Sequence, residues 1–89
     1  MQRRLVYFSG TVQGVGFRFT AIHLAGQYEV TGTVRNLPDG RVEVVAEGPS
    51  DQIDALVADI RTRMSGYVRQ VAQETSEPTG SFTGFTVAY

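Results

Sequence analysis

The sequence of 89 residues has no cysteine and only one histidine. The absence of cysteine excludes disulfide bonds, thiolate catalysis and cysteine-ligated metals, and a single histidine is too few for a histidine-rich zinc site. The basic start, Met1 to Arg4, is followed by only four apolar residues, Leu5 to Phe8. That run is too short for a signal-peptide core or a membrane span, so we expect a cytoplasmic protein with no membrane segment and no metal.

Basic charge is also scarce, because 8 lysines and arginines stand against 9 acidic residues, for a net charge of −1. A nucleic-acid surface needs a basic stripe, and an RNA-binding sheet would also carry the signature R-G-F/Y-G/A-F-V-x-F/Y, which is missing. We therefore expect no nucleic-acid partner. The 42% of hydrophobic and 19% of charged residues are ordinary for a globular protein, and the length predicts one domain over residues 1–89.

Segments rich in β-branched and aromatic residues predict the strands. They cover residues 4–10, 30–36 and 41–47, a stretch that begins near Tyr67, and a short last run that contains Phe85, Val87 and Tyr89. Residues 37–40, Leu-Pro-Asp-Gly, suit a tight turn between the second and third strands, and the turn alone explains Asp39. In the third strand, alternation directs Glu43 and Glu47 outward, where we expect a solvated face.

Helical spacing predicts two helices. The first begins at Phe17; the second opens at residues 48–51, where Ser50 or Asp51 is the candidate N-cap, and Gly66 ends it. His23 lies off the apolar face of the first helix and is expected to be a solvated surface residue, while Phe19 and Ile22 lie off it without an assigned role. The inward faces consist of Phe17, Ala21, Leu24, Ala25 and Tyr28 in the first helix and Ile53, Leu56, Val57, Ile60 and Met64 in the second.

The predicted order is strand, helix, strand, strand, helix, strand, with a short extra strand at the end. This order is typical of an α+β sandwich of the ferredoxin-like kind, βαββαβ, with two helices on one face of a mainly antiparallel sheet. The fold by itself names no function.

The segment between the first strand and the first helix carries three glycines, at positions 10, 14 and 16. Glycines allow successive backbone N–H groups to converge on one point, and a helix N-terminus followed by an arginine, Arg18, suits an anion such as phosphate or sulfate. The spacing matches neither the nucleoside-triphosphate loop nor the dinucleotide fingerprint. A tight strand-to-helix turn and an anion cradle therefore both remain open from the glycines and Arg18 alone.

Longer motifs carry a resemblance to a known family. Residues 10–18 read GTVQGVGFR, and residues 32–43 contain G-x-V-R-N-x-x-D-G-x-V-E. Together with Gly48 before the second helix and Phe85 in the last strand, these motifs resemble the acylphosphatase family over essentially the whole chain. Two positions depart from the family pattern: Glu29 stands where a glycine is usual and Thr33 where a tryptophan is usual. A positive φ at Glu29 would cost on the order of 1 kcal/mol, and the missing tryptophan would alter packing or the edge of the substrate pocket.

The resemblance implies hydrolysis of a small-molecule acyl phosphate without a metal or cofactor. It implies that Arg18 holds the phosphate, that Asn36 orients the attacking water, and that the phosphate-binding loop consists of Gln13, Gly14, Val15, Gly16, Phe17 and Arg18. Without the resemblance, the sequence favours a structural role for Asn36, as a turn-forming residue at the end of a strand. A monomer is expected. The competing interpretation is a binding module of the same fold that holds a phosphorylated ligand without hydrolysing it.

Overall fold

The computed structural model describes residues 1–89. Its elements in chain order are β1 (Gln2–Gly10), α1 (Phe17–Ala25), β2 (Thr31–Asn36), β3 (Val42–Gly48), α2 (Ser50–Arg63), β4 (Val68–Ser76) and β5 (Phe85–Val87). Every predicted strand and helix is present. The strand bounds differ by one or two residues from the expected ones, whereas α1 ends at Ala25 and α2 at Arg63, three residues before Tyr28 and Gly66. The last strand ends at Val87, so the predicted extension to Tyr89 is wrong.

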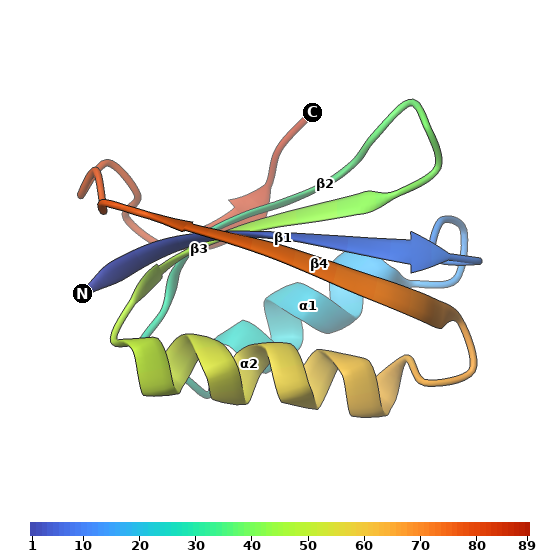
Figure 1. Ribbon diagram of the computed structural model, residues 1–89, viewed down its shortest axis with the longest axis horizontal. Helices are drawn as coiled ribbons and strands as arrows, with labels where there is room; N and C mark the ends of the chain where they lie inside the picture. The colour runs from blue at the N-terminus through green and yellow to red at the C-terminus, as the bar shows by residue number, and fades with distance from the viewer.

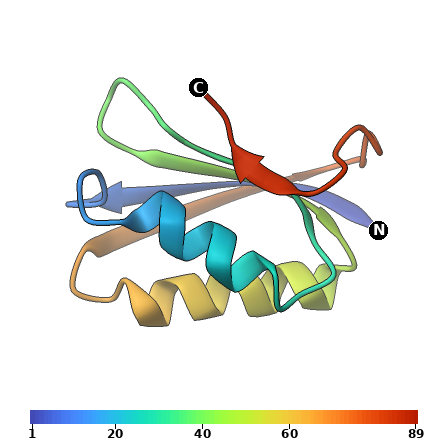
Figure 2. The ribbon, with the colours of Figure 1, turned by 180° about the vertical axis from the view of Figure 1, so that it is seen from behind.

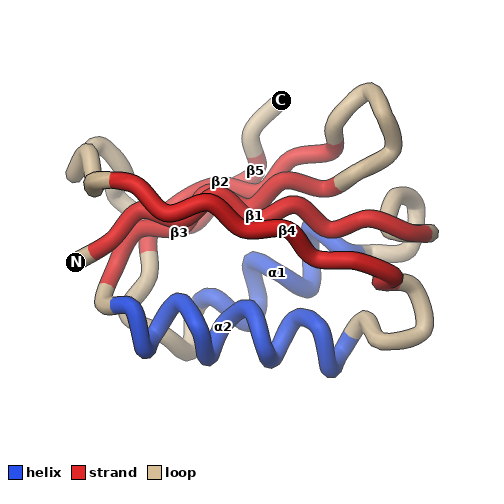
Figure 3. Tube along the Cα trace, viewed as in Figure 1, coloured by secondary structure: helices blue, strands red, loops and turns tan.

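The five strands form one sheet in the order β4-β1-β3-β2-β5. β1 pairs antiparallel with β3 and β4, and β2 pairs antiparallel with β3; only the short β5 runs parallel to its neighbour, β2. Figures 1 and 3 show both helices on one face of this sheet. The ferredoxin-like arrangement predicted from the sequence is therefore confirmed, including its short C-terminal strand.

The core lies between the sheet and the two helices. α1 buries Phe17, Ala21, Leu24 and Ala25, as the helical spacing predicted. Tyr28 lies beyond the end of α1 and is partly buried; its hydroxyl donates to Asp59 Oδ2 on α2 at 2.9 Å. The remaining buried core residues are Val6, Phe8, Val12, Val30, Val34, Val42, Val44, Ala46, Ile53, Leu56, Val57, Ile60 and Met64.

The start of α2 differs from the prediction. Its N-cap is Pro49 in extended conformation, and no side chain caps the helix, so the expected cap by Ser50 or Asp51 is wrong. The Pro49 carbonyl accepts the N–H groups of Gln52 and Ile53 instead, at 3.0 and 3.1 Å. A proline directly before the helix directs the chain into its first turn because its φ is already near the helical value.

The strand β3 corrects a second prediction. Glu43 and Glu47 were expected on a solvated face, but they are only 8% and 4% exposed. β3 is the central strand of the sheet, and the segment after β4 covers Glu47 on its outer face through Thr79 and Gly80. Arg35 Nε donates to Glu43 at 2.9 Å, so this buried carboxylate has a cationic partner. Side-chain alternation along β3 gave the correct face of the sheet for both glutamates. It could not show that other parts of the chain cover this face.

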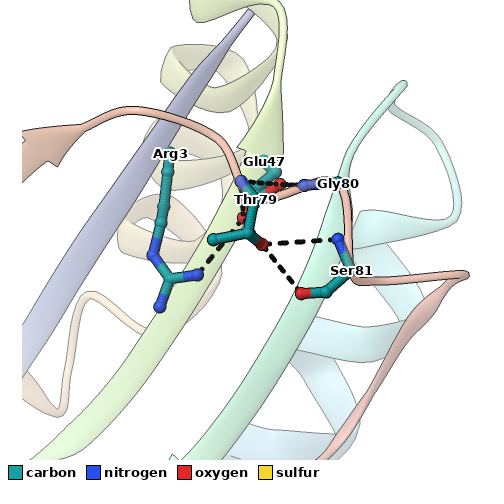
Figure 4. Close-up of polar contacts among 5 residues, drawn as sticks. All are labelled: Arg3, Glu47, Thr79, Gly80 and Ser81. Atoms are coloured by element: carbon teal, nitrogen blue, oxygen red, sulfur yellow. Dashed lines mark hydrogen bonds and ion pairs between the residues drawn. The ribbon is translucent and has the colours of Figure 1, made fainter.

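Glu47 anchors the segment that follows β4. Its carboxylate accepts the backbone N–H groups of Thr79 and Gly80 at 3.0 and 2.9 Å, the Thr79 hydroxyl at 2.8 Å, and Arg3 Nη1 at 3.2 Å (Figure 4). Burial opposes ionisation of Glu47, but these donors together lower its pKa to about 2. One buried carboxylate thus holds the segment that leads into β5 against the sheet.

The two ends of the sheet carry different features. The loop from β1 to α1 and the turn from β2 to β3 lie at one end, on the right in Figure 1 and on the left in Figure 2. The Glu47 cluster lies at the other end.

No helix is long and apolar enough to cross a membrane. No residue other than glycine has a positive φ, so Glu29 adopts an ordinary backbone conformation and the strain considered for it is absent.

Candidate active site

The topology brings the glycine loop and Asn36 to the same edge of the sheet. β1 and β2 both run antiparallel to β3, so they point in the same direction and their C-terminal ends meet at one edge. Val42 of β3 faces Phe8 on one side and Asn36 on the other. The loop that follows β1 therefore starts close to the end of β2 that carries Asn36.

The loop conformation depends on two glycines. Gly14 and Gly16 have φ values of 78° and 79°, in the left-handed region that side-chain-bearing residues rarely adopt. No atom beyond the adjacent residues of the chain lies within 4 Å of the position that a Cβ would take at either glycine. The space in front of both glycines is thus open, and the requirement for glycine comes from the backbone conformation alone.

Gln13 fastens the loop to the neighbouring hairpin. Its side-chain Nε2 donates to the carbonyl oxygens of Leu37 and Arg41, at 2.8 and 2.9 Å. These two carbonyls flank the turn that directly follows Asn36, where Leu37 N–H also donates to the Arg41 carbonyl at 2.8 Å. The predicted loop residue Gln13 therefore connects the glycine loop to the end of β2 and does not line the pocket described below.

The N-terminus of α1 opens toward the same region. Gly16 is its N-cap, no side chain caps the helix, and its first turn has no acidic residue. The first helical hydrogen bond runs from Thr20 N–H to the Gly16 carbonyl at 3.0 Å, so the preceding amides have no helical acceptor. Unpaired amides and the positive end of the helix dipole favour an anion here. Arg18, in this first turn, adds a full positive charge.

A pocket of about 410 Å³ lies at this edge of the sheet, a volume typical of a site for a small molecule. Arg18 is its only charged lining residue, and Asn36 faces the same space from β2. No aspartate, glutamate, histidine or lysine side chain lines it. The full lining consists of Val12, Gly14, Gly16, Phe17, Arg18, Phe19, Ile22, Asn36, Val87 and Tyr89.

The pocket unites most, but not all, of the residues predicted from the sequence. Gly14, Gly16, Phe17 and Arg18 line it with Asn36, whereas Val15 packs partly buried against the core. The Phe17 ring belongs to the core as well, since it lies against Phe8 with ring centroids 4.9 Å apart.

Sequence reasoning missed five apolar lining residues: Val12, Phe19, Ile22, Val87 and Tyr89. The position of Phe19 off the core face of α1 was a signal that it serves something other than the core, whereas Ile22 lines the pocket and also packs against the core. No such signal existed for Val87 and Tyr89, because only the pairing of β5 with β2 brings this stretch to the pocket.

Two polar residues near the pocket have other partners. Asp39 accepts the backbone N–H of Arg41 at 3.1 Å and its Nε at 2.7 Å, and the backbone hydrogen bond is the main reason its pKa is lowered. Asp39 therefore serves the turn, as its sequence context predicted. Thr33, at the position where the family usually has tryptophan, faces Val45 in the sheet and does not line the pocket.

The fold and the pocket define the class: a small ferredoxin-like protein with a pocket at one edge of its sheet, which is lined by an arginine, an asparagine and a glycine loop. The family profile described as Acylphosphatase matches residues 5–87. The chain belongs to the acylphosphatase family, and it is a hydrolase that acts on acyl phosphates.

Relatives of known name agree with this assignment. The acylphosphatase of Methylococcus capsulatus is 46% identical over 98% of this chain and 96% of its own. The crystal structure of acylphosphatase from Bacillus subtilis is 29% identical, covers both chains fully and superimposes with a TM-score of 0.89. An acylphosphatase structure from Coxiella burnetii is 33% identical over 98% of this chain and 92% of its own, with a TM-score of 0.82.

Proposed function

We propose that Arg18 and the loop amides bind the phosphoryl group of an acyl phosphate, and that Asn36 orients the water that attacks it, with no metal or cofactor. The observation that carries this proposal is the shared pocket of Arg18, Asn36 and the two left-handed glycines. A guanidinium, loop amides and a helix N-terminus together supply donors for several phosphoryl oxygens at once.

The reaction places limited demands on the protein. Water oxygen forms a bond to phosphorus while the bond between phosphorus and the bridging acyl oxygen breaks. The products are a carboxylate and dihydrogen phosphate, so the two charges of the dianionic substrate end on two separate anions and the water protons remain on phosphate. Because the leaving carboxylate is a weak base with a pKa of roughly 4, it departs without a general acid. Positioning and charge stabilisation are sufficient.

Each polar group then has one task. Arg18 and the loop amides collect the negative charge that the phosphoryl oxygens carry in the transition state, an effect worth roughly 3 kcal/mol for a single donor. The Asn36 amide oxygen accepts a hydrogen bond from the water, and its NH₂ group donates to a phosphoryl oxygen or a second water. Gln13 holds the two parts of the site at a fixed separation through its bonds to the hairpin.

The experiment that tests this division of tasks is the variant Asn36→Ala. Its turnover of an acyl phosphate should fall by about 100-fold or more, the scale at which a misplaced reactant reduces rate. Inorganic phosphate should still bind with nearly unchanged affinity, measured as phosphate-dependent stabilisation of the same preparation. Thr33→Ala is the matched control, because it truncates a polar residue of the same strand on the opposite face and should leave both properties unchanged. Full turnover in Asn36→Ala would contradict the role, and a joint loss of phosphate binding and stability would make Asn36 a structural turn residue.

Three further predictions belong to this proposal. Phosphate and sulfate should compete with substrate for the loop; the protein should act as a monomer; and it should be located in the cytoplasm. Enzyme assays with added anions, sedimentation and cell fractionation test them in turn.

A further inference from the structure

We infer that the apolar side of the pocket is an acyl-group site, and that Phe19 makes the enzyme select acyl phosphates with an aromatic or bulky apolar acyl group. This inference rests on the proposed function, because it takes the phosphoryl end of the substrate to lie at Arg18. Phe19 is the third residue of α1, and its side chain is 78% exposed. An exposed phenylalanine contributes little to the core, yet this one lines the pocket.

The pocket lining divides into a polar and an apolar part. Gly14, Gly16, Arg18 and Asn36 supply the polar groups, while Phe19 and Ile22 from α1 and Val87 and Tyr89 from the end of the chain supply apolar surface. An acyl phosphate divides in the same way, into a phosphoryl dianion and an acyl group joined by one bridging oxygen. With the phosphoryl group at the glycine loop, the acyl group extends toward the apolar part.

The neighbours of Phe19 favour a flat ligand. Its ring is stacked on that of His23, one turn further along α1, with centroids 6.4 Å apart and planes inclined by only 5°. The Tyr89 side chain is also fully exposed and lines the same pocket. Aromatic rings in such positions offer large, stiff contact surfaces to another ring or to a branched aliphatic group.

The lining offers no cationic partner to a charged acyl group. Arg18 is the only charged residue of the pocket, and the phosphoryl group occupies it. An acyl group that carries a second carboxylate finds no second cation in this lining, and the Phe19 and Tyr89 side chains offer it apolar surface alone. An acetyl group is too small to cover the Phe19 ring. The site therefore suits uncharged acyl groups of the size of a benzoyl group.

The test compares two pairs of compounds in wild type, Phe19→Ala, Phe19→Tyr and Phe82→Ala. Phe82 is the matched control, because it is a phenylalanine outside the pocket whose ring lies under Arg3. Turnover is measured with benzoyl phosphate and acetyl phosphate. Binding is measured by calorimetry with benzylphosphonate and methylphosphonate, which cannot be hydrolysed. Melting temperatures check that each variant is folded.

We expect wild type to prefer the aromatic member of both pairs. Phe19→Ala should raise the KM for benzoyl phosphate and the Kd for benzylphosphonate by about 3- to 10-fold, the range of one aromatic contact, and should leave the small compounds within about 2-fold. Phe19→Tyr should retain the preference, and Phe82→Ala should behave as wild type. Equal losses for both members of a pair, or no loss, would overturn the inference.

The two proposals fail in different ways. If the phosphonates show the Phe19-dependent preference but neither acyl phosphate is hydrolysed, the acyl-group site stands and the proposed reaction is wrong. If both acyl phosphates are hydrolysed without a preference that depends on Phe19, the reaction stands and the acyl-group site is wrong. If neither phosphonate binds and neither acyl phosphate is hydrolysed, both are wrong.

Discussion

Replacement of Glu47 by glutamine should destabilise the protein in a way that depends on pH. The carboxylate is 4% exposed and accepts hydrogen bonds from Thr79, Gly80 and Arg3. Glutamine keeps the shape, but it removes the charge and turns one acceptor oxygen into a donor that faces the Thr79 or Gly80 N–H. At neutral pH the variant therefore loses several charge-assisted hydrogen bonds at once.

The magnitude follows from the pKa of Glu47, which is lowered from 4.5 to about 2. A lowered pKa means that the folded state holds the ionised form more tightly than the unfolded state does. The resulting stabilisation is fully present above about pH 4.5 and is lost as the pH falls through about 2. One unit corresponds to about 1.4 kcal/mol, so the contribution amounts to about 3 kcal/mol at most. This is a large part of the stability of a small domain.

Urea unfolding of wild type and Glu47→Gln at pH 7 and at pH 2.5 measures this contribution. The difference in free energy of unfolding should be roughly 2 to 3 kcal/mol at pH 7 and should shrink to about 1 kcal/mol or less at pH 2.5. Glu77→Gln is the control, because Glu77 is an exposed carboxylate in the same segment and the change should have little effect at either pH. A gap of equal size at both pH values, or no gap at pH 7, would refute the reasoning.

Three other predictions concern the site. Phosphate at about ten times its dissociation constant should stabilise wild type by about 1.4 kcal/mol and raise its melting temperature by several degrees, and Arg18→Ala should abolish this rise; an unchanged response would remove Arg18 from the site. Gln13→Ala deletes two hydrogen bonds to the hairpin, worth about 1 kcal/mol each, and should lower kcat about 10-fold or more while phosphate binding persists; an unaltered kcat would show that the tether is dispensable. Turnover should vary little between pH 5 and 8 beyond the ionisation of the substrate, because no aspartate, glutamate or histidine side chain lines the pocket; an inflection near pH 6.5 that disappeared in His23→Gln would make that histidine functional.

Most of the fold could be predicted because the hydrophobic period is a local property of the sequence. The alternation in residues 30–36 and 41–47 and the helical spacing from Phe17 and Ile53 each report directly which side of an element faces the core. The end of the last strand was harder to predict, because alternation continues to Tyr89 after the hydrogen-bonded pairing has ended at Val87. The N-cap of α2 was predicted wrongly for a similar reason. Residues that commonly cap helices, Ser50 and Asp51, are present, but the N-cap is Pro49.

The parts that could not be predicted depend on contacts between distant segments. Glu47 looks like a solvated residue of a strand because the segment that covers it follows more than thirty positions later, at Thr79 and Gly80. Gln13 belongs to a recognisable loop, yet only the structure shows that its side chain reaches the Leu37 and Arg41 carbonyls. The sequence motifs predicted the polar residues of the pocket. They could not predict its apolar residues, because that part of the pocket forms where α1 meets the stretch after β5.

The central claim is that Arg18 and the glycine loop bind the phosphoryl group of an acyl phosphate that is hydrolysed without a metal. The measurement that tests it most directly is the rate of benzoyl phosphate hydrolysis in excess EDTA by wild type and Arg18→Ala. We predict that the rate of wild type is unaffected by the chelator and that kcat/KM of the variant is lower by at least about 100-fold, which corresponds to the roughly 3 kcal/mol of one transition-state donor. Loss of the wild-type rate in EDTA, or a variant as active as wild type, would contradict the claim.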